Sequence, residues 1–331
     1  MLSDWLDLTL NEHSTAVPEE GRIPFGRYRL LGPGMLELEP HSVGSHAHAC
    51  ILSAGIHGNE TAPIELLGEL LSMIEAGRLR LGAPLLIILG NIPAIQAGQR
   101  FLDTNLNRLF QRGIQQDGVE PDRARQLMRA VDGFYLRHSG LPPLHYDLHT
   151  AIRDSHYPRF VVEPYDENAV TDDAQWQWFA AADLQAVLHQ HQHSWTFSHY
   201  SKHYHQAQSF TLELGKVAPF GDNDLTSLRL MLCLLSALVE GREPPSDRAS
   251  RMAFFRVEHE LMRNSAGFQL CFDDDTPNFS EFAPGERLAH DPSTGNFIVG
   301  DRPLAVVFPN ANVEIGARAA LLVVPSPPPT P

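Results

Sequence analysis

The sequence predicts an α/β protein with a mixed, mostly parallel sheet flanked by helices and a small β domain at the C-terminus. Two apolar runs, residues 50–52 and 85–89, lie on either side of a helical stretch, at the spacing of a strand–helix–strand unit. The run at 85–89 is apolar without alternation, which is typical of a strand buried on both faces of a parallel sheet. Beyond residue 252 only short strand-like runs remain, broken by Gly and Pro.

Length and charge restrict the class of protein. With 331 residues the chain is longer than one average domain, and its net charge of −15 argues against nucleic acid as a partner. No apolar run approaches the roughly 18 residues of a membrane span, and the acidic N-terminal stretch lacks the basic region of a signal peptide. Cys50, Cys233 and Cys271 suit neither a disulfide framework nor a thiolate metal site. We expect a cytoplasmic protein that acts on a small molecule. If that substrate is anionic, the positive charge that binds it must be local.

The first half of the chain predicts four elements. Short apolar alternations within residues 1–48, broken by Gly32-Pro33-Gly34, predict a hairpin at the edge of the domain. The strand at 50–52 is followed by a helix from about Pro63 to residue 76, which Gly77 ends. The strand at 85–89 follows, and the polar stretch 98–112 predicts a loop.

The second half alternates helices and strands up to a domain boundary. Helices are expected over 122–138, 172–189 and 225–240, and strands over 144–148 and 211–214. Residues 241–250 carry two prolines and mixed charge, so we expect a catalytic domain over 1–245 and a β domain over 246–331. Strands of the β domain are expected at 253–258, 267–272, 297–299, 304–308 and 321–324, before a disordered or polyproline tail.

His57 and Glu60 lie in the turn between the first buried strand and its helix. Ligands of open α/β sheets are usually held at this end of a strand, and an imidazole with a carboxylate suits Zn²⁺. The alternative is an ordinary loop histidine and an acid favoured by the helix dipole. An H-x-x-E pair by itself is unspecific, so the metal interpretation depends on a third ligand elsewhere.

His149 directly follows a second predicted strand, and Glu213 lies near the end of a third. Because the carboxyl ends of parallel strands meet at one edge of a sheet, both side chains are expected to lie near His57 and Glu60. A catalytic zinc site has three protein ligands and one open position. The sequence therefore predicts one Zn²⁺ per subunit, held by His57, Glu60 and His149, with Glu213 free to act as general base.

Four short motifs resemble those of the succinylglutamate desuccinylase and aspartoacylase branch of the zinc carboxypeptidase-like family. They are GIHGNETAP, NRLF, DLHTAIR and TLELGK, in the family's order over most of residues 50–220. The resemblance implies a zinc-carboxypeptidase-like fold. It also implies hydrolysis of the amide bond of N-succinyl-L-glutamate to succinate and L-glutamate, the last step of arginine degradation by the succinyltransferase pathway.

The resemblance also implies roles for three further residues. Asn107 and Arg108 would hold the carboxylate of the released amino acid, and Arg100 would polarise the scissile carbonyl. Outside these motifs, both arginines would be read as solvated surface residues. Asn105 departs from the family pattern, which has an Asp there to accept a hydrogen bond from the first zinc-binding histidine. An amide fixes the ring without adding charge, so lower zinc affinity is expected unless Asp103 or Asp147 supplies the charge.

Two other cations follow the ligands closely in sequence. Arg153 is four residues after His149, and Lys216 is three residues after Glu213. We expect one or both to bind the distal carboxylates of the tri-anionic substrate; the alternative for each is a surface charge.

The run 189–205 contains six histidines but no acidic residue or Cys, so an exposed strand or loop is favoured over a second metal site. Two other functions remain open. One is an acylase for another N-acyl amino acid, with the same site and a different acyl pocket. The other is an inactive metal-binding relative, against which the presence of Glu213 argues.

Overall fold

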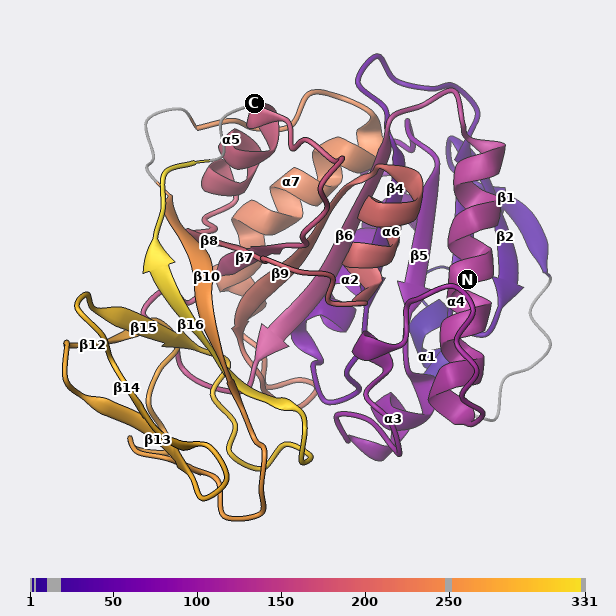
Figure 1. Ribbon diagram of the computed structural model, residues 1–331. Coiled ribbons are helices and arrows are strands. Elements are labelled where there is room, and N and C mark those ends of the chain that lie inside the picture. Colours follow the sequence, from indigo (N-terminus) through magenta and orange to yellow (C-terminus); the bar gives the residue numbers. More distant parts are fainter. Residues whose placement is uncertain (1, 3, 11–18, 248–251, 329–331) are drawn as a thin grey trace.

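The computed structural model describes residues 2, 4–10, 19–247 and 252–328 (Figure 1). Its core is one large mixed sheet with helices on both faces, which confirms the predicted α/β class. In the described residues, the sheet has thirteen strands in the order β1-β2-β3-β5-β4-β6-β9-β7-β8-β10-β16-β15-β12.

The N-terminal edge of the sheet is an antiparallel meander. It consists of β1 (Glu20–Ile23), β2 (Gly26–Gly32) and β3 (Met35–Pro40). The predicted hairpin is thus present with one more strand, and β3 joins it to the main sheet by pairing antiparallel with β5 (Leu85–Leu89).

Four parallel strands occupy the middle of the sheet. They are β5, β4 (Ala49–Ala54), β6 (Pro143–Ala151) and β9 (Gln208–Lys216). β7 (Phe160–Glu163) then pairs antiparallel with β9 and parallel with β8 (Ala186–His189). Antiparallel pairs therefore flank the parallel centre, and the sheet is more mixed than the apolar runs alone indicate.

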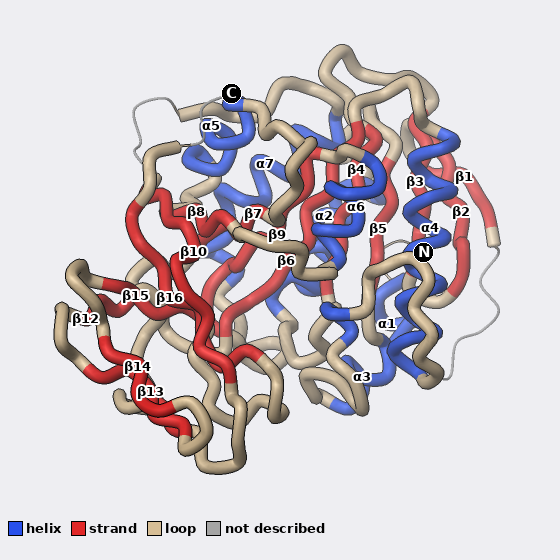
Figure 2. Tube along the Cα trace, viewed as in Figure 1, coloured by secondary structure: helices blue, strands red, loops and turns tan. Residues whose placement is uncertain are grey.

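The C-terminal part continues the same sheet. β10 (Ala253–Met262) pairs parallel with β8, and β16 (Arg318–Pro325), β15 (Leu304–Val307) and β12 (Ser280–Phe282) follow by antiparallel pairing. A separate three-stranded sheet contains β11 (Gln269–Leu270), β13 (Arg287–Asp291) and β14 (Gly295–Ile298). Figure 2 shows that residues 252–328 contain strands and loops only, as expected for a small β domain. The predicted boundary falls next to residues 248–251, and the last tail residues likewise lie outside the described part.

Helices cover the two faces of the sheet separately. One face carries α1 (Trp5–Leu10), α2 (Ala62–Glu75), α5 (Asp173–Ala181) and α7 (Arg229–Glu240), which share one buried cluster with the sheet. The other carries α4 (Val119–Arg137) and α6 (Phe197–His205), with their own cluster (Figure 1). The remaining elements are short: α3 (Ile92–Ala97) and the 3₁₀ turns η1 (Leu106–Arg108) and η2 (Leu225–Leu228).

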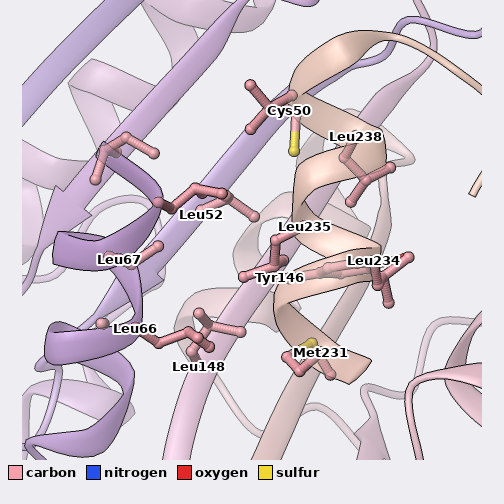
Figure 3. Packing of buried hydrophobic residues seen from close by; sticks show 14 of the residues in the cluster. Cys50, Leu52, Leu66, Leu67, Tyr146, Leu148, Met231, Leu234, Leu235 and Leu238 are labelled. Atoms are coloured by element: carbon pink, nitrogen blue, oxygen red, sulfur yellow. The ribbon is translucent and has the colours of Figure 1, made fainter. Parts of the chain in front are cut away.

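Alternation along the strands decides which face each side chain reaches. Cys50 and Leu52 of β4 point to the α2 and α7 face, whereas Ala49 and Ile51 point to the α4 face. Figure 3 shows the first of these faces, where Leu52 and neighbouring side chains pack between the two helices. The continuous apolar pattern of the central strands follows, because both faces are covered.

Two predicted elements differ in type from the structure. The helix expected over 172–189 ends at Ala181, and the last residues form β8 instead. A short apolar run such as 186–188 does not distinguish strand from helix by periodicity, and here the neighbouring strands decide. The stretch expected to be an exposed strand or loop includes α6, whose start is capped by Thr196, the acceptor of a hydrogen bond from the His199 amide at 3.2 Å.

Among the residues that the structure describes, every helix is too short or too polar to cross a lipid bilayer.

Candidate active site

A strip of polar side chains crosses the α4 and α6 face of three adjacent strands. Alternation places Ser53 of β4, Asp147 and His149 of β6, and Thr211 and Glu213 of β9 on this face, because their apolar neighbours point the other way. The parallel register pairs Ser53 with Asp147, Asp147 with Thr211, and His149 with Glu213. All five side chains are buried, so this strip is a polar site within an apolar core.

The turn from β4 to α2 is held close to this strip. Gly55 has a φ of +67°, which glycine adopts without strain, and a Cβ on Gly58 would lie 2.2 Å from the backbone of Ala94 in α3. The turn can therefore approach α3 only with glycine at this position. It places His57 and Glu60 beside His149.

His57, Glu60 and His149 form a compact donor set. His57 Nδ1 lies 2.8 Å from Glu60 Oε1, and His149 Nδ1 lies 2.9 Å from Glu60 Oε2. One donor atom from each residue lies within 4.8 Å of the other two, and the residues are 4%, 2% and 2% exposed. Two imidazoles and a carboxylate are a donor set that Zn²⁺ takes, so the residues present fit this ion.

The charges of the three groups depend on one another. Burial disfavours charge on all of them. The carboxylates of Asp147 and Glu60 nevertheless raise the pKa of His149 well above its usual value, and the histidines lower the pKa of Glu60 well below its own. Burial and the nearby Arg100 lower the pKa of His57 to about 4, so this ring is neutral at pH 7, the form that binds a metal.

The outer nitrogens of the two histidines face different partners. His57 Nε2 lies 3.1 Å from Asn105 Oδ1, whereas His149 Nε2 lies 2.9 Å from Asp147 Oδ2. Asp147 also accepts a hydrogen bond from Ser53 at 2.6 Å. The suggestion that Asp147 replaces the missing charge at His57 is therefore wrong, because this carboxylate contacts His149.

Glu213 lies on the strand next to His149. It is 6% exposed, and within the described residues its Oε2 is buried without a hydrogen-bond partner. Burial raises the pKa of Glu213 to about 7; the charge of His149 opposes this, and that of Glu60 adds to it. A carboxylate with this pKa can both accept and release a proton near neutral pH.

Arg100 approaches the donor set from the segment after α3. Its Nη1 donates to Glu60 Oε1 at 2.8 Å, and its side chain is 34% exposed. The guanidinium thus lies at the solvent side of the buried site. Its other donors are not engaged by Glu60.

Asn107 and Arg108 lie in the 3₁₀ turn η1. Asn107 is buried, and its Oδ1 accepts the amide hydrogen of Phe197, the first residue of α6, at 2.9 Å. Only its amide nitrogen is left to donate to a substrate. Arg108 is exposed, and its Nη1 donates to the Asn107 carbonyl at 2.7 Å.

The structure treats the two remaining cations differently. Arg153 Nε donates to the Pro309 carbonyl in the C-terminal part at 2.8 Å, and its Nη1 is buried without a partner among the described residues. Lys216 instead pairs with Asp154 at 2.9 Å, and its side chain is 56% exposed. Lys216 therefore lies in a solvent-exposed ion pair.

The sequence prediction misplaced one residue and missed three contacts. His149 lies inside β6, not after it, whereas Glu213 lies inside β9, in agreement with the strand predicted at 211–214. The contacts of His149 with Asp147, of Asp147 with Ser53, and of Ser53 with His145 were not predicted. The signal was present, because residues two apart in a strand share a face, and His145, Asp147 and His149 are spaced in this way.

Comparison with known proteins shows the family to which the chain belongs. Residues 46–238 match the model of the succinylglutamate desuccinylase/aspartoacylase catalytic domain, and residues 250–326 match the barrel-sandwich hybrid domain of the same family. The succinylglutamate desuccinylase of Ectopseudomonas mendocina is 39% identical over 98% of this chain and 97% of its own length. That of Pseudomonas putida is 38% identical over 98% and 97%.

Solved structures show the same relationship. The crystal structure of succinylglutamate desuccinylase from Vibrio cholerae has a TM-score of 0.89 and 31% identity, covering 97% of this chain and 94% of its own. The enzyme of that name from Chromobacterium violaceum has a TM-score of 0.84 and 32% identity, covering 98% of both chains. The chain therefore belongs to the succinylglutamate desuccinylase/aspartoacylase family.

Proposed function

We propose that this protein is a zinc-dependent hydrolase that cleaves the amide bond of N-succinyl-L-glutamate to give succinate and L-glutamate. The observation that carries the proposal is the buried set His57, Glu60 and His149, with Glu213 unpartnered on the adjacent strand. The relatives with 38–39% identity are named succinylglutamate desuccinylase, which supports the choice of substrate. With this substrate, the reaction would be the last step of arginine degradation by the succinyltransferase pathway.

His57, Glu60 and His149 would hold the zinc ion. When bound, the ion supplies a Lewis acid that polarises the scissile carbonyl and makes a water molecule more acidic. The outer contacts to Asn105 and Asp147 keep each ring in one orientation, with Nδ1 toward Glu60.

Glu213 would transfer the proton. Its carboxylate accepts a proton from the attacking water while the water oxygen bonds to the carbonyl carbon. As the carbon–nitrogen bond breaks, Glu213 returns that proton to the departing nitrogen of glutamate. A pKa near 7 allows both transfers with little energetic cost, and burial excludes competing proton donors.

Three arginines would provide the local positive charge that this acidic chain needs. Arg100, at the solvent side of Glu60, would donate to the carbonyl oxygen as negative charge develops there. Arg108 and the free amide nitrogen of Asn107 would bind a carboxylate of glutamate. Arg153, with one buried and unpartnered nitrogen, would bind a distal carboxylate. Lys216 is the weaker candidate, because Asp154 already pairs with it.

A parallel assay of two substrates tests the proposal. Purified protein loaded with zinc should release glutamate from N-succinylglutamate and turn over N-acetylaspartate far more slowly. A preference for N-acetylaspartate or another acyl group would indicate an acylase with a different pocket. No release from any N-acyl amino acid, from protein that contains zinc, would indicate an inactive relative.

A further inference from the structure

A second group of histidines lies on α6 and on the loop before it, outside the proposed active site. One ring nitrogen from each of His193, His199 and His203 lies within 4.8 Å of the other two. His199 and His203 are one helical turn apart on α6, and their rings stack with centroids 5.4 Å apart. His193 comes from the preceding loop, and its ring lies edge-on to both, with centroids 5.0 Å away. The fold therefore gathers three imidazoles that the sequence separates by six and four residues.

The inner nitrogens of this cluster face one another. His193 Nδ1 lies 2.8 Å from His199 Nε2. Without a metal, these two nitrogens share one proton in a hydrogen bond, and a cation bound by both would replace that proton. Imidazole nitrogen is a ligand for Zn²⁺ and for Cu²⁺ and Ni²⁺.

The outer nitrogens have the partners that metal-binding histidines usually have. His203 Nδ1 lies 2.7 Å from Asp166 Oδ2, which leaves its Nε2 free. His193 Nε2 lies 3.5 Å from Glu167 Oε2, which leaves its Nδ1 to face His199. A carboxylate on the outer nitrogen orients the ring and makes the inner nitrogen a better ligand.

His199 is satisfied at only one of its two ring nitrogens among the described residues, Nε2 toward His193. The residue is fully buried, and its Nδ1 has no hydrogen-bond partner in the described part of the chain. His193 and His203 remain about one-third exposed, which gives an ion a path from solvent.

A third group of possible ligands already has charged partners within the protein. This group consists of Glu37, Glu39 and His138. The carboxylate of Glu37 already forms hydrogen bonds with Arg29, Arg137 and His138. Its charge is balanced within the protein. The histidine cluster differs, because the only lysine of α6, Lys202, forms its ion pair with Glu163 and not with the cluster.

We propose that His193, His199 and His203 form a second metal site that binds Zn²⁺ or a similar divalent transition-metal ion. The ion would join the loop that carries His193 to the first two turns of α6. That helix start is bound to the proposed active site at two points. The Phe197 amide donates to Asn107 Oδ1 at 2.9 Å, and Ser198 Oγ lies 2.7 Å from Thr211 Oγ1, two residues before Glu213. The second ion is thus a structural one that fixes α6 against the substrate-binding turn.

Zinc stoichiometry tests this site. Untagged protein is incubated with Zn²⁺, freed of unbound metal by gel filtration, and analysed for metal and protein. The wild-type chain should retain about two zinc ions, and His203→Gln about one. His205→Gln is the matched control: it lies on the same helix and contacts Asp132 instead, so it should retain two.

A second variant distinguishes zinc bound at the histidine cluster from zinc bound at the proposed catalytic site. His149→Ala should also retain one ion, and in this background zinc should still raise the temperature of unfolding by several degrees. That rise should disappear in the double variant His149→Ala/His203→Gln. Asp166→Asn, which keeps all three ligands, should weaken zinc binding at this site about 10- to 100-fold.

Two results would overturn the second site. One is that the wild-type chain retains a single zinc ion and the His149→Ala variant retains none. The other is a His203→Gln variant that is folded and retains as much zinc as wild type. Either result leaves the proposed hydrolase activity untouched, because that activity is measured separately with N-succinylglutamate.

Discussion

At the residue scale, Glu213 is the side chain on which the proposed reaction depends most. Glu213→Gln should keep the fold and bound zinc, because the amide is isosteric and Glu213 is not among the proposed ligands. Turnover should fall by about 10² to 10⁴, because an amide cannot accept the proton from water. Steady-state kinetics with a metal analysis of the same sample measures this. A variant within a few-fold of wild type would remove Glu213 from the mechanism.

Asn105 and Asp147 form a natural pair for testing how outer contacts affect the metal. Asn105 Oδ1 faces His57 and Asp147 Oδ2 faces His149. Asn105→Asp should strengthen zinc binding and Asp147→Asn should weaken it, each by about tenfold or more, since a carboxylate makes the ligating nitrogen more basic. Competition with a chelator measures both affinities. Equal affinities for Asn105→Asp and wild type would mean that the amide already serves as well as a carboxylate.

Arg153 and Lys216 separate substrate recognition from surface charge. Arg153→Met should lower kcat/KM for N-succinylglutamate about ten- to a hundred-fold, the cost of one charged hydrogen bond, with far less effect on N-butyrylglutamate. Lys216→Met is the matched control, and its exposed ion pair with Asp154 predicts a change of a few-fold at most. Equal losses on both substrates for Arg153→Met would show that this residue supports the structure through Pro309.

At the scale of the elements, Glu37 joins β3 to the C-terminal end of α4. Burial opposes its charge, but hydrogen bonds from His138, Arg137 and Arg29 outweigh burial and lower its pKa to about 2. A carboxylate with a lowered pKa stabilises the fold above its usual pKa of 4.5, and this contribution disappears as pH falls from about 4.5 toward 2.

Glu37→Gln should therefore lower the free energy of unfolding at pH 7 by about 1.5–3 kcal/mol, a range that allows for the partial exposure of both arginines. Denaturant titration at pH 7 and at pH 3 measures the difference, which should shrink at the lower pH. Glu39→Gln, whose partner Arg27 is exposed, should cost less than about 1 kcal/mol. An equal loss for both variants at pH 7 would contradict the role given to Glu37.

Periodicity predicted the long apolar elements well and failed where tertiary contacts decide. The strand at 85–89 and the helix starting near Pro63 agree with β5 and α2, because their patterns are strong and their ends are marked by Gly and Pro. α6 was missed, because its sequence FSHYSKHYH has weak helix propensity. It forms where Thr196 caps it and where Phe197 and Tyr200 reach the buried cluster on the α4 face.

For the proposed site, the sequence predicted the candidate residues but not their contacts. Three candidate ligands and Glu213 could be found, since strand ends and turns can be located from the sequence and the motifs resemble a known family. The partners of these ligands depend on side-chain directions and on contacts across strands. The same holds for the three histidines of α6 and its preceding loop, which come together only because 197–205 is a helix.

At the scale of the molecule, the sheet joins the two sequence regions matched by separate family models. β8 pairs with β10, and one buried cluster contains side chains of β7, β8, β10, β15 and β16. The C-terminal strands therefore pack directly against β7 and β8, which come after β9 in the order of the sheet. Arg153 also reaches across to Pro309. The domain boundary expected near residue 245 remains a prediction about the chain's organisation.

The whole molecule is acidic, yet its proposed substrate is a tri-anion. A net charge of −15 gives no general attraction, so binding must depend on a few local cations near the donor set. Arg100, Arg108 and Arg153 are the arginines to which we give that role. Zinc would be the further positive charge at the same place.

Zinc titration of metal-depleted protein tests the central claim most directly. The rate of glutamate release from N-succinylglutamate is measured as zinc is added back to protein treated with a chelator. We expect almost no activity without metal, and recovery that saturates with zinc in the wild type. His149→Ala, folded and treated in the same way, should not recover. Full turnover by the metal-depleted wild type, or full recovery by His149→Ala, would contradict a zinc hydrolase built on His57, Glu60 and His149.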